Sequence, residues 1–491
     1  MNNPSMPTSA GLGGFRFDNS WLRDLPGTYV EQAPDAAPVP QILVLNHRLA
    51  AALALEPEDL AQHPGWFAGG AVPNGAAPIA LAYAGHQFGG FSPQLGDGRA
   101  HLIGEHIGPD GRRWDIQLKG SGRTPFSRGG DGKAALGPML REHLISEAMA
   151  ALGVPTTRSL AVALTGEDVR RDAGRLPGAV VTRVAASHLR VGTLQFWAAR
   201  GDLDTLARVV DYAIARHDPD LVGQEGRVLA FFDRITARQA RLVAAWMGLG
   251  FVHGVLNTDN VALSGETIDY GPCAFMEAYA PGTVFSSIDR QGRYSYANQP
   301  HILAWNMAKL AESLLPLMGD QDAAVAVLND RLSGVADIYA AEWLTVMRDK
   351  LALDGAQEGD AELARGFLAA MDGQGADWTL AFRRLAEAAD DDPTPLRALF
   401  TESARLDLWL PLWRARLRTD AAPHLRRTNP LVIPRNHMVE AALHAAEQGD
   451  LSPFTTLLAA VTDPYSDHPG REAFALPAPT GFGEYVTFCG T

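Results

Sequence analysis

The stretch FVHGVLNTDNVALSGETIDYG, residues 251–271, sets the interpretation of the whole sequence. Its second half predicts a β-hairpin, because two short apolar runs, 261–263 and 267–269, flank a turn that contains Gly265. The hairpin would hold three polar side chains near one another: Asp259, Asn260 and Asp269. Carboxylate and amide oxygens are ligands that Mg²⁺ prefers, often together with phosphates. A solvated turn is the simpler alternative, since Asn, Asp and Gly are ordinary turn formers.

The spacing of polar residues in this stretch is typical of the catalytic and metal-binding loops of protein-kinase-like enzymes. A His-Gly pair at 253–254 precedes Asn260, and an Asp-x-Gly sequence begins at Asp269. One position departs from the pattern, because Val255 stands where small-molecule kinases of this superfamily carry an aspartate. The only nearby carboxylate is that of Asp259. Either the fold has lost its activity, or a displaced base works in a different geometry.

The composition is that of a globular protein with an excess of acidic residues. The chain has 491 residues, of which 46% are hydrophobic, and a formal net charge of −14. That length accommodates two lobes with elaborations. The charge argues against a general nucleic-acid binder, and the absence of any run of 18 apolar residues argues against a membrane span. Two cysteines and no secretory signal favour a cytoplasmic location.

Lysine is rare: four of the 42 basic residues are Lys119, Lys133, Lys309 and Lys350. Lys119 ends a predicted strand, 113–119, whose apolar residues alternate. It follows a glycine-rich segment, 84–99, in which backbone N–H groups can approach phosphate oxygens and Arg99 can add a charged contact. Kinase-like folds place their phosphate-binding lysine at such a position.

A helix predicted at 138–152 ends before Gly153. Glu142 and Glu147 lie at opposite margins of its buried stripe, so helical geometry alone does not choose which of them pairs with Lys119. Both could equally be solvated surface acids.

Further strands at 159–164 and 179–184 complete an expected sheet of about five strands. Helical patterns dominate residues 191–250 and 301–448. Three outlying segments complete the expectation: disorder at 1–16, a packing helix at 40–55, and an extended, exposed tail at 485–491.

With these segments placed, the sequence resembles the selenoprotein O family, called YdiU in bacteria. The resemblance runs from about Phe17 to the last residues. Its blocks are FDNSWLRDLPG, YAGHQFGGFSPQLGDGRA, WDIQLKGSGRTPFSRGGDGKA, LREHLISEAMAALGVPTTRSLAV, HGVLNTDNVALSGETIDYGP and LRRTNPLVIPRN. It implies an α+β, protein-kinase-like two-lobe fold. The small β-rich N-lobe, 1–190, would carry one key helix, and the mainly helical C-lobe, 191–491, the catalytic and metal-binding loops.

The family transfers AMP from ATP to Ser, Thr or Tyr hydroxyls of proteins, with ATP inverted relative to ordinary kinases. Asp259 matches its proton acceptor, and Asn260 and Asp269 match its ligands for Mg²⁺, with Mn²⁺ as an alternative ion. The resemblance also implies a set of nucleotide-binding positions: Gly96, Gly98, Arg99, Lys119, Asp131, Gly132, Glu142, Arg183, Arg190 and Asp269.

The implied enzyme is therefore a protein adenylyltransferase that releases pyrophosphate, acts on protein substrates and binds neither nucleic acid nor membrane. Two alternatives stay open. One is a protein kinase that transfers the γ-phosphate, and the other is an inactive pseudokinase acting as a redox or scaffold module, which Val255 favours.

The two cysteines, Cys273 and Cys489, suggest a disulfide that forms under oxidising conditions and holds the tail near the active-site loop. Two unrelated thiols are the alternative. The family's terminal cysteine is usually followed by two serines, whereas Gly490 and Thr491 follow it here.

Overall fold

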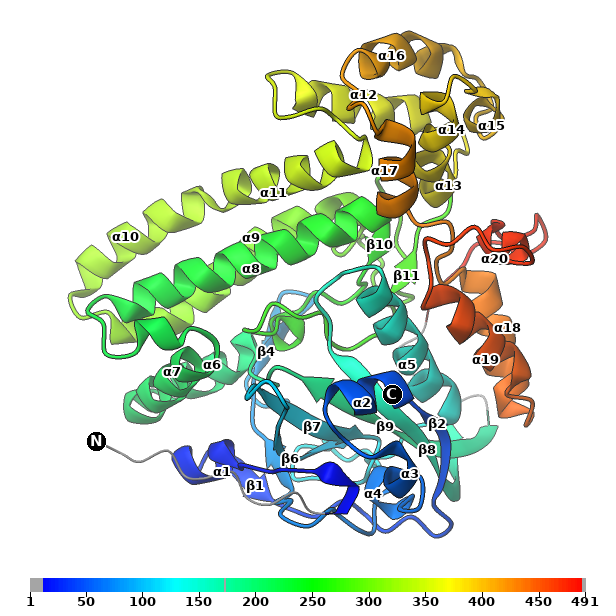
Figure 1. The fold of residues 1–491 in the computed structure, drawn as a ribbon. Helices are drawn as coiled ribbons and strands as arrows, with labels where there is room; N and C mark the ends of the chain where they lie inside the picture. Colours follow the sequence, from blue (N-terminus) through cyan, green and yellow to red (C-terminus); the bar gives the residue numbers. More distant parts are fainter. Residues whose placement is uncertain (1–11, 172–173, 488–491) are drawn as a thin grey trace.

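The computed structural model describes residues 12–171 and 174–487, in which an N-terminal antiparallel sheet with one long helix precedes a largely helical region (Figure 1). The sheet has seven strands in the order β1-β3-β6-β7-β9-β8-β2, two more than the five expected. Their bounds are β1 Tyr29–Glu31, β2 Gln41–Leu45, β3 Ile79–Leu81, β6 Ala100–Ile107, β7 Arg113–Lys119, β8 Arg158–Arg171 and β9 Gly174–Ala185.

Alternation along the central strands gives the sheet two buried faces. Val162 of β8 and Val181 of β9 join the main hydrophobic core with helix α5, Leu136–Ala151. Their neighbours Ala163 and Val180 belong to a second core on the opposite face. Short helices cover that second face: α2 His47–Ala52, α3 Pro57–Leu60 and α4 Gly65–Ala68. The predicted helix at 138–152 is thus confirmed as α5.

Two small strand pairs, one short α-helix and five 3-10 helices complete the described N-terminal half and the loops. They are η1 Leu12–Gly14, α1 Ser20–Asp24, the hairpin β4 Gly85–Gln87 and β5 Gly90–Ser92, the pair β10 Phe251–Val252 and β11 Ala274–Phe275, η2 Pro219–Leu221, η3 Thr258–Asn260, η4 Tyr296–Asn298 and η5 Leu315–Leu317.

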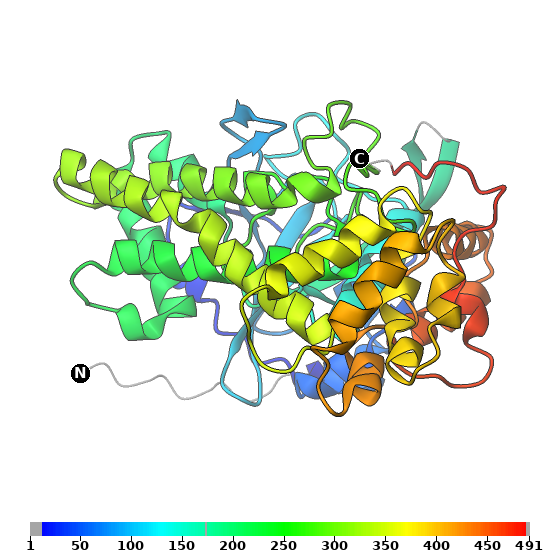
Figure 2. The same ribbon diagram turned by 90° about the horizontal axis from the view of Figure 1, so that it is seen from above.

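The second half is built around α8, Arg227–Leu249, which lies beside α9, Gln299–Leu314, and α11, Val335–Lys350 (Figures 1 and 2). The remaining helices are α6 Val191–Ala198, α7 Leu203–His217, α10 Gln321–Ser333, α12 Asp360–Met371, α13 Trp378–Arg383, α14 Leu385–Ala389, α15 Thr394–Arg397, α16 Ala404–Arg414, α17 Ala421–Thr428, α18 Asn436–Glu447, α19 Ser452–Val461 and α20 Glu472–Ala475. Among the described helices, none is both long and apolar enough to cross a membrane.

Helix α8 delivers the chain to the stretch 251–271. It ends at Gly250, whose φ of +68° is the left-handed conformation that glycine adopts most easily at a helix end. A side chain there would also collide with Trp378, since a Cβ would lie 2.8 Å from its ring. The chain then enters β10, which pairs with β11 and fixes both ends of the loop region.

The hairpin predicted within 261–269 is wrong. Ala262 bridges to Arg190, and Thr267 bridges to Thr156 in parallel, so each run pairs with another part of the chain. The backbone N–H groups of the two runs are paired outside the expected hairpin. The N–H of Leu263 donates to the carbonyl of Leu189 and that of Thr267 to the carbonyl of Pro155, each over 2.9 Å. A buried His253 ties the loops together, because its Nε2 donates to the carbonyl of Ile268 over 2.9 Å.

Three other expectations need correction. Within the expected disordered segment 1–16, Phe15 is buried and stacks on Phe17, while residues 1–11 lie outside the described part. The segment 40–55 is strand β2 followed by α2. The tail is docked up to Thr487, whose N–H donates to Phe285 O over 2.7 Å and whose side chain is buried.

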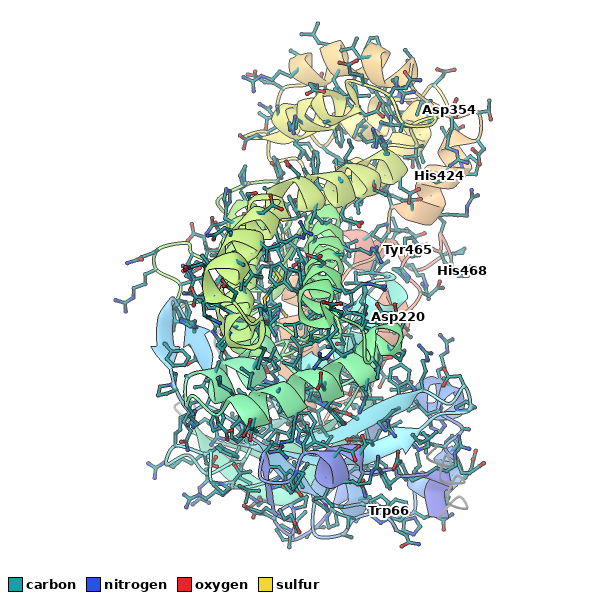
Figure 3. All side chains as sticks on the ribbon, turned by 90° about the vertical axis from the view of Figure 1, so that its left-hand side faces the viewer. Trp66, Asp220, Asp354, His424, Tyr465 and His468 are labelled. Atoms are coloured by element: carbon teal, nitrogen blue, oxygen red, sulfur yellow. The ribbon has the colours of Figure 1, made fainter. Side chains whose placement is uncertain are left out.

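A cavity of about 370 Å³ lies where the end of α5 meets α8, α11 and α17. Tyr465, labelled in Figure 3, is one of its lining residues. Lys350 lines it and is buried, with Nζ 2.7 Å from Asn429 Oδ1 and 4.2 Å from the centre of the Phe382 ring. Burial lowers the pKa of the Lys350 ammonium to about 7. This lysine therefore contributes to stability in a pH-dependent way.

Unfolded lysine has a pKa near 10.4, so the unfolded chain binds more protons than the folded chain between pH 7 and pH 10. The free energy of unfolding should therefore rise with pH. Relative to Lys350→Met, the wild type is expected to gain stability from pH 7 to pH 8.5, on the order of 1–2 kcal/mol. Urea unfolding at both pH values measures this, with Lys309→Met as the surface control. A Lys350→Met difference that does not change with pH would contradict it.

Candidate active site

Lys119 stands at the end of β7, on the sheet face that carries Arg183. Gln117 of β7 lies opposite Arg183 of β9, and Lys119 follows two residues later on the same face. Its Nζ donates to Glu142 Oε2 over 2.7 Å and to Asp269 Oδ1. The strand thus presents the lysine to one carboxylate from α5 and one from the 251–271 stretch.

Arg183 completes a buried cluster of two cations and two carboxylates. Its Nη2 donates to Asp269 Oδ1 over 2.8 Å, and its Nε donates to Glu142 Oε1. Burial alone would raise the pKa of Glu142, but the cations of Arg183 and Lys119 outweigh it and hold that pKa below its ordinary value. The same cations, Lys119 first, hold the pKa of Asp269 well below its ordinary value against the effect of burial. Both carboxylates are charged at neutral pH.

The structure decides the choice that spacing left open on α5. Glu142 faces Lys119, whereas Glu147 pairs with Arg158 over 2.6 Å and accepts from the N–H of Ser159. Both glutamates are buried, so neither is the solvated surface acid considered as the alternative.

Asp269 occupies the left-handed region, with φ of +70°, which a non-glycine residue adopts at a cost in backbone energy. Its own carbonyl accepts from the N–H of Gly271 over 2.9 Å, so the Asp-Tyr-Gly sequence forms a tight turn. The turn directs the carboxylate, whose side chain is 28% exposed, toward Lys119 and Arg183. The unfavourable backbone conformation thus occurs at Asp269, a residue that the sequence analysis assigns to metal and nucleotide binding.

Asp259 lies in η3 and is almost fully buried. Its Oδ2 accepts from Gln87 Nε2 over 3.1 Å, while Oδ1 is buried and has no hydrogen-bond partner within the described residues. Burial raises the pKa of Asp259 to about 6. Its carbonyl accepts from Arg190 Nη1 over 3.1 Å, so Arg190 braces the loop from the start of α6.

Asn260 is held by its amide nitrogen, which donates to the carbonyl of Val255 over 2.9 Å. The amide oxygen is therefore the acceptor end of this side chain. Val255 itself is buried and apolar, so its side chain offers no base, and its backbone carbonyl is what holds Asn260.

The glycine-rich segment splits into two parts. Residues 85–92 form the β4–β5 hairpin, which packs on η3. Gly96 and Gly98 instead form the turn before β6, and no side chain fits at either position. A Cβ at Gly96 would lie 2.3 Å from the ring of Phe126. A Cβ at Gly98 would lie 2.8 Å from the carbonyl oxygen of the same residue. Arg99 is half-buried at the end of this turn, and its carbonyl accepts from the N–H of Gly120 over 2.7 Å.

The described contacts of Asp131 and Gly132 are not with the charged cluster but with Arg171 and Gly122. Asp131 pairs with Arg171 of the β8–β9 hairpin over 2.8 Å and is half-exposed. Gly132 has φ of +72° and packs against Gly122, where a Cβ would lie 2.2 Å from the backbone. This loop is thereby attached to the strand end next to Lys119.

Two residues that the sequence interpretation missed support the site. Asp97 is buried between the two glycines of the turn, where it accepts from Leu81 N over 3.1 Å and from Gln117 over 3.3 Å. Gln87 reaches Asp259 from the β4–β5 hairpin. A carboxylate between two glycines is a signal that could have identified Asp97, whereas no local signal marks Gln87.

Cys273 is buried and forms no disulfide within the described residues, and burial raises the pKa of its thiol to about 12. Its backbone carbonyl accepts from Arg141 over 2.6 Å. The expected partner, Cys489, lies outside the described residues, so the disulfide stays a hypothesis.

The chain matches the family described as "Protein adenylyltransferase SelO" over residues 16–462. The protein nucleotidyltransferase YdiU of Cereibacter sphaeroides (strain KD131 / KCTC 12085) is 60% identical over 481 residues, which cover 97% of this chain and 100% of that protein. Those of Rhizobium johnstonii and Mycobacterium sp. (strain KMS) are each 52% identical, over 97% and 96% of this chain and 97% and 99% of their own lengths. The chain therefore belongs to the SelO/YdiU family of protein adenylyltransferases and is a protein nucleotidyltransferase enzyme.

Proposed function

We propose that this enzyme transfers AMP from ATP to Ser, Thr or Tyr hydroxyls of proteins. The observation that carries the proposal is the buried cluster of Lys119, Arg183, Glu142 and Asp269, which lies beside the loop that bears Asp259. Within the proposal the fold is a protein-kinase-like pair of lobes, 1–190 and 191–491. The antiparallel sheet with α5 and the helical remainder support that division.

The residues present fit a divalent cation such as Mg²⁺, with Mn²⁺ as an alternative. Asn260 offers an amide oxygen and Asp269 a partly exposed carboxylate. The buried Oδ1 of Asp259, without a partner in the described residues, is a further oxygen of the right type. No group of three or more His, Cys, Asp or Glu side chains in the described part forms a cation site alone. Phosphate and water oxygens would therefore complete the coordination, as is common for Mg²⁺.

The chain's own side chains supply the remaining functions. In the proposed complex Lys119 and Arg183 bind phosphate oxygens, with Glu142 holding both cations in place. Arg190 and Arg99, together with the glycine turn and the loop of Asp131 and Gly132, surround the rest of the nucleotide. A bound cation would neutralise developing charge on the phosphates.

Asp259 takes the hydroxyl proton in the proposed reaction. The substrate oxygen forms a bond to the α-phosphorus, the bond from that phosphorus to the bridging oxygen breaks, and pyrophosphate leaves. Val255 cannot supply this base, and Asp259 lies four residues further along the loop, which supports a nucleotide placed differently from that of ordinary kinases. General-base assistance of this type contributes roughly 10²–10⁴-fold.

Label transfer tests the proposed function directly. The purified protein, with Mg²⁺ or Mn²⁺, is incubated with a protein mixture and ATP labelled on either the α- or the γ-phosphate. Protein-bound label is expected from the α-phosphate alone, and Lys119→Ala is expected to remove it, because the main phosphate-binding cation is lost. Label from the γ-phosphate alone would make the enzyme a kinase. Absence of label from both would support the inactive pseudokinase.

A further inference from the structure

The β4–β5 hairpin crosses from the N-terminal sheet region to the loop that bears Asp259. Figure 2 shows it as a small blue two-stranded arm that stands away from the main sheet. The glycine-rich sequence predicts that backbone N–H groups of segment 84–99 approach phosphates, but in this hairpin those of His86 and Phe88 donate to Thr258 and Asn257. The hairpin therefore has a role that the nucleotide-binding assignment does not explain.

Hydrogen bonds attach the hairpin to successive residues of the loop. The N–H of His86 donates to Thr258 Oγ1 over 2.7 Å, and the N–H of Phe88 donates to Asn257 Oδ1 over 3.3 Å. Thr258 Oγ1 donates in turn to Gln195 of α6 over 2.6 Å. Gln87 lies between His86 and Phe88, so these hydrogen bonds hold its backbone next to the loop and its side chain next to Asp259.

Gln87 and Gly85 together define the surroundings of the Asp259 carboxylate. The side chain of Gln87 donates a hydrogen bond to it, over 3.1 Å to Oδ2. The backbone of Gly85 packs against the other oxygen, so closely that a Cβ would lie 2.5 Å from Oδ1. One hairpin strand thus restricts the position of both carboxylate oxygens.

We propose that Gln87 is a positioning residue for the transfer reaction, which holds the Asp259 carboxylate in the orientation that accepts the hydroxyl proton. This inference rests on the proposed role of Asp259. In the proposed role Gln87 contacts no nucleotide group and acts only through Asp259. Loss of the amide would let the carboxylate rotate, and small misplacements of a reacting group cost up to about a hundredfold in rate.

Steady-state label transfer, measured over a range of α-labelled ATP concentrations, tests the proposal on four purified proteins: the wild type, Gln87→Leu, Asp259→Asn, and the double variant. Gln87→Leu is expected to lower the transfer rate about ten- to hundredfold, with the KM for ATP and the melting temperature unchanged. In the Asp259→Asn background the same substitution should cause no further loss, because the group it positions is gone. Gln94→Leu, an exposed glutamine in the same segment, serves as the control with wild-type rates.

The residual rate of Asp259→Asn, expected at roughly 10²–10⁴ below the wild type, is measurable with a labelled substrate over long incubations. An unchanged rate in Gln87→Leu, or an equal loss in both backgrounds, would overturn the positioning role. A raised KM with an unchanged turnover number would also overturn it, since that pattern indicates nucleotide binding. Wild-type turnover in Asp259→Asn would instead overturn the proton-acceptor assignment, so the two failures are distinguishable.

Discussion

Asp269→Ala is expected to reduce AMP transfer at least about 10³-fold. The carboxylate accepts from both Lys119 and Arg183, and in the proposed function it also binds the cation that neutralises the phosphates. Its removal therefore eliminates a metal ligand and releases two cations from their fixed positions. The left-handed backbone at this residue is a further sign that its orientation matters.

The measurement is α-label transfer by the purified variant, with melting temperature as a check of folding. Asp220→Ala, at an exposed aspartate that pairs with Arg234 and has no described contact with the cluster, is the matched control and should retain wild-type transfer (Asp220 is labelled in Figure 3). Near-normal turnover in Asp269→Ala would refute the metal assignment. Because Asp269 is 28% exposed and Glu142 remains, the variant is expected to stay folded.

Glu142→Ala is expected to cause the largest loss of stability, about 3–5 kcal/mol in the free energy of unfolding. The substitution leaves the buried cations of Lys119 and Arg183 with the partly exposed Asp269 as their remaining carboxylate partner among the described residues. A buried charge without a partner is costly, because the protein interior solvates it far less than water does. Transfer activity should fall as well, since Lys119 loses the group that orients it.

Glu147→Ala on the same helix is the matched comparison. Glu147 is equally buried, but its partner Arg158 has a side chain that is 31% exposed and can turn to water. Its loss of stability is expected to be smaller, and AMP transfer should persist. Urea unfolding of both variants measures the difference. Equal destabilisation with full activity in Glu142→Ala would contradict the proposed role of the cluster.

Local patterns predicted part of this protein well. Alternating apolar residues identified strand β7 and placed Lys119 at its end, and the apolar stripe identified α5. Such patterns are local, because side-chain direction repeats every two residues in a strand and every 3.6 in a helix. The hairpin prediction at 261–269 failed for the same reason. Nothing in the local pattern shows that Ala262 pairs with Arg190 and Thr267 with Thr156, both of which lie far away in the sequence.

The sequence by itself determined the chemical groups of the site and the family, since the types and spacing of residues 251–271 and the long matching blocks are properties of the chain alone. Only the tertiary structure decided the partners. Glu142 rather than Glu147 faces Lys119, Gln87 meets Asp259 across 172 residues of sequence, and Thr487 docks on Phe285. Those contacts depend on how the sheet, α5 and the loops pack against one another, and packing is a property of the whole fold, which no local period encodes.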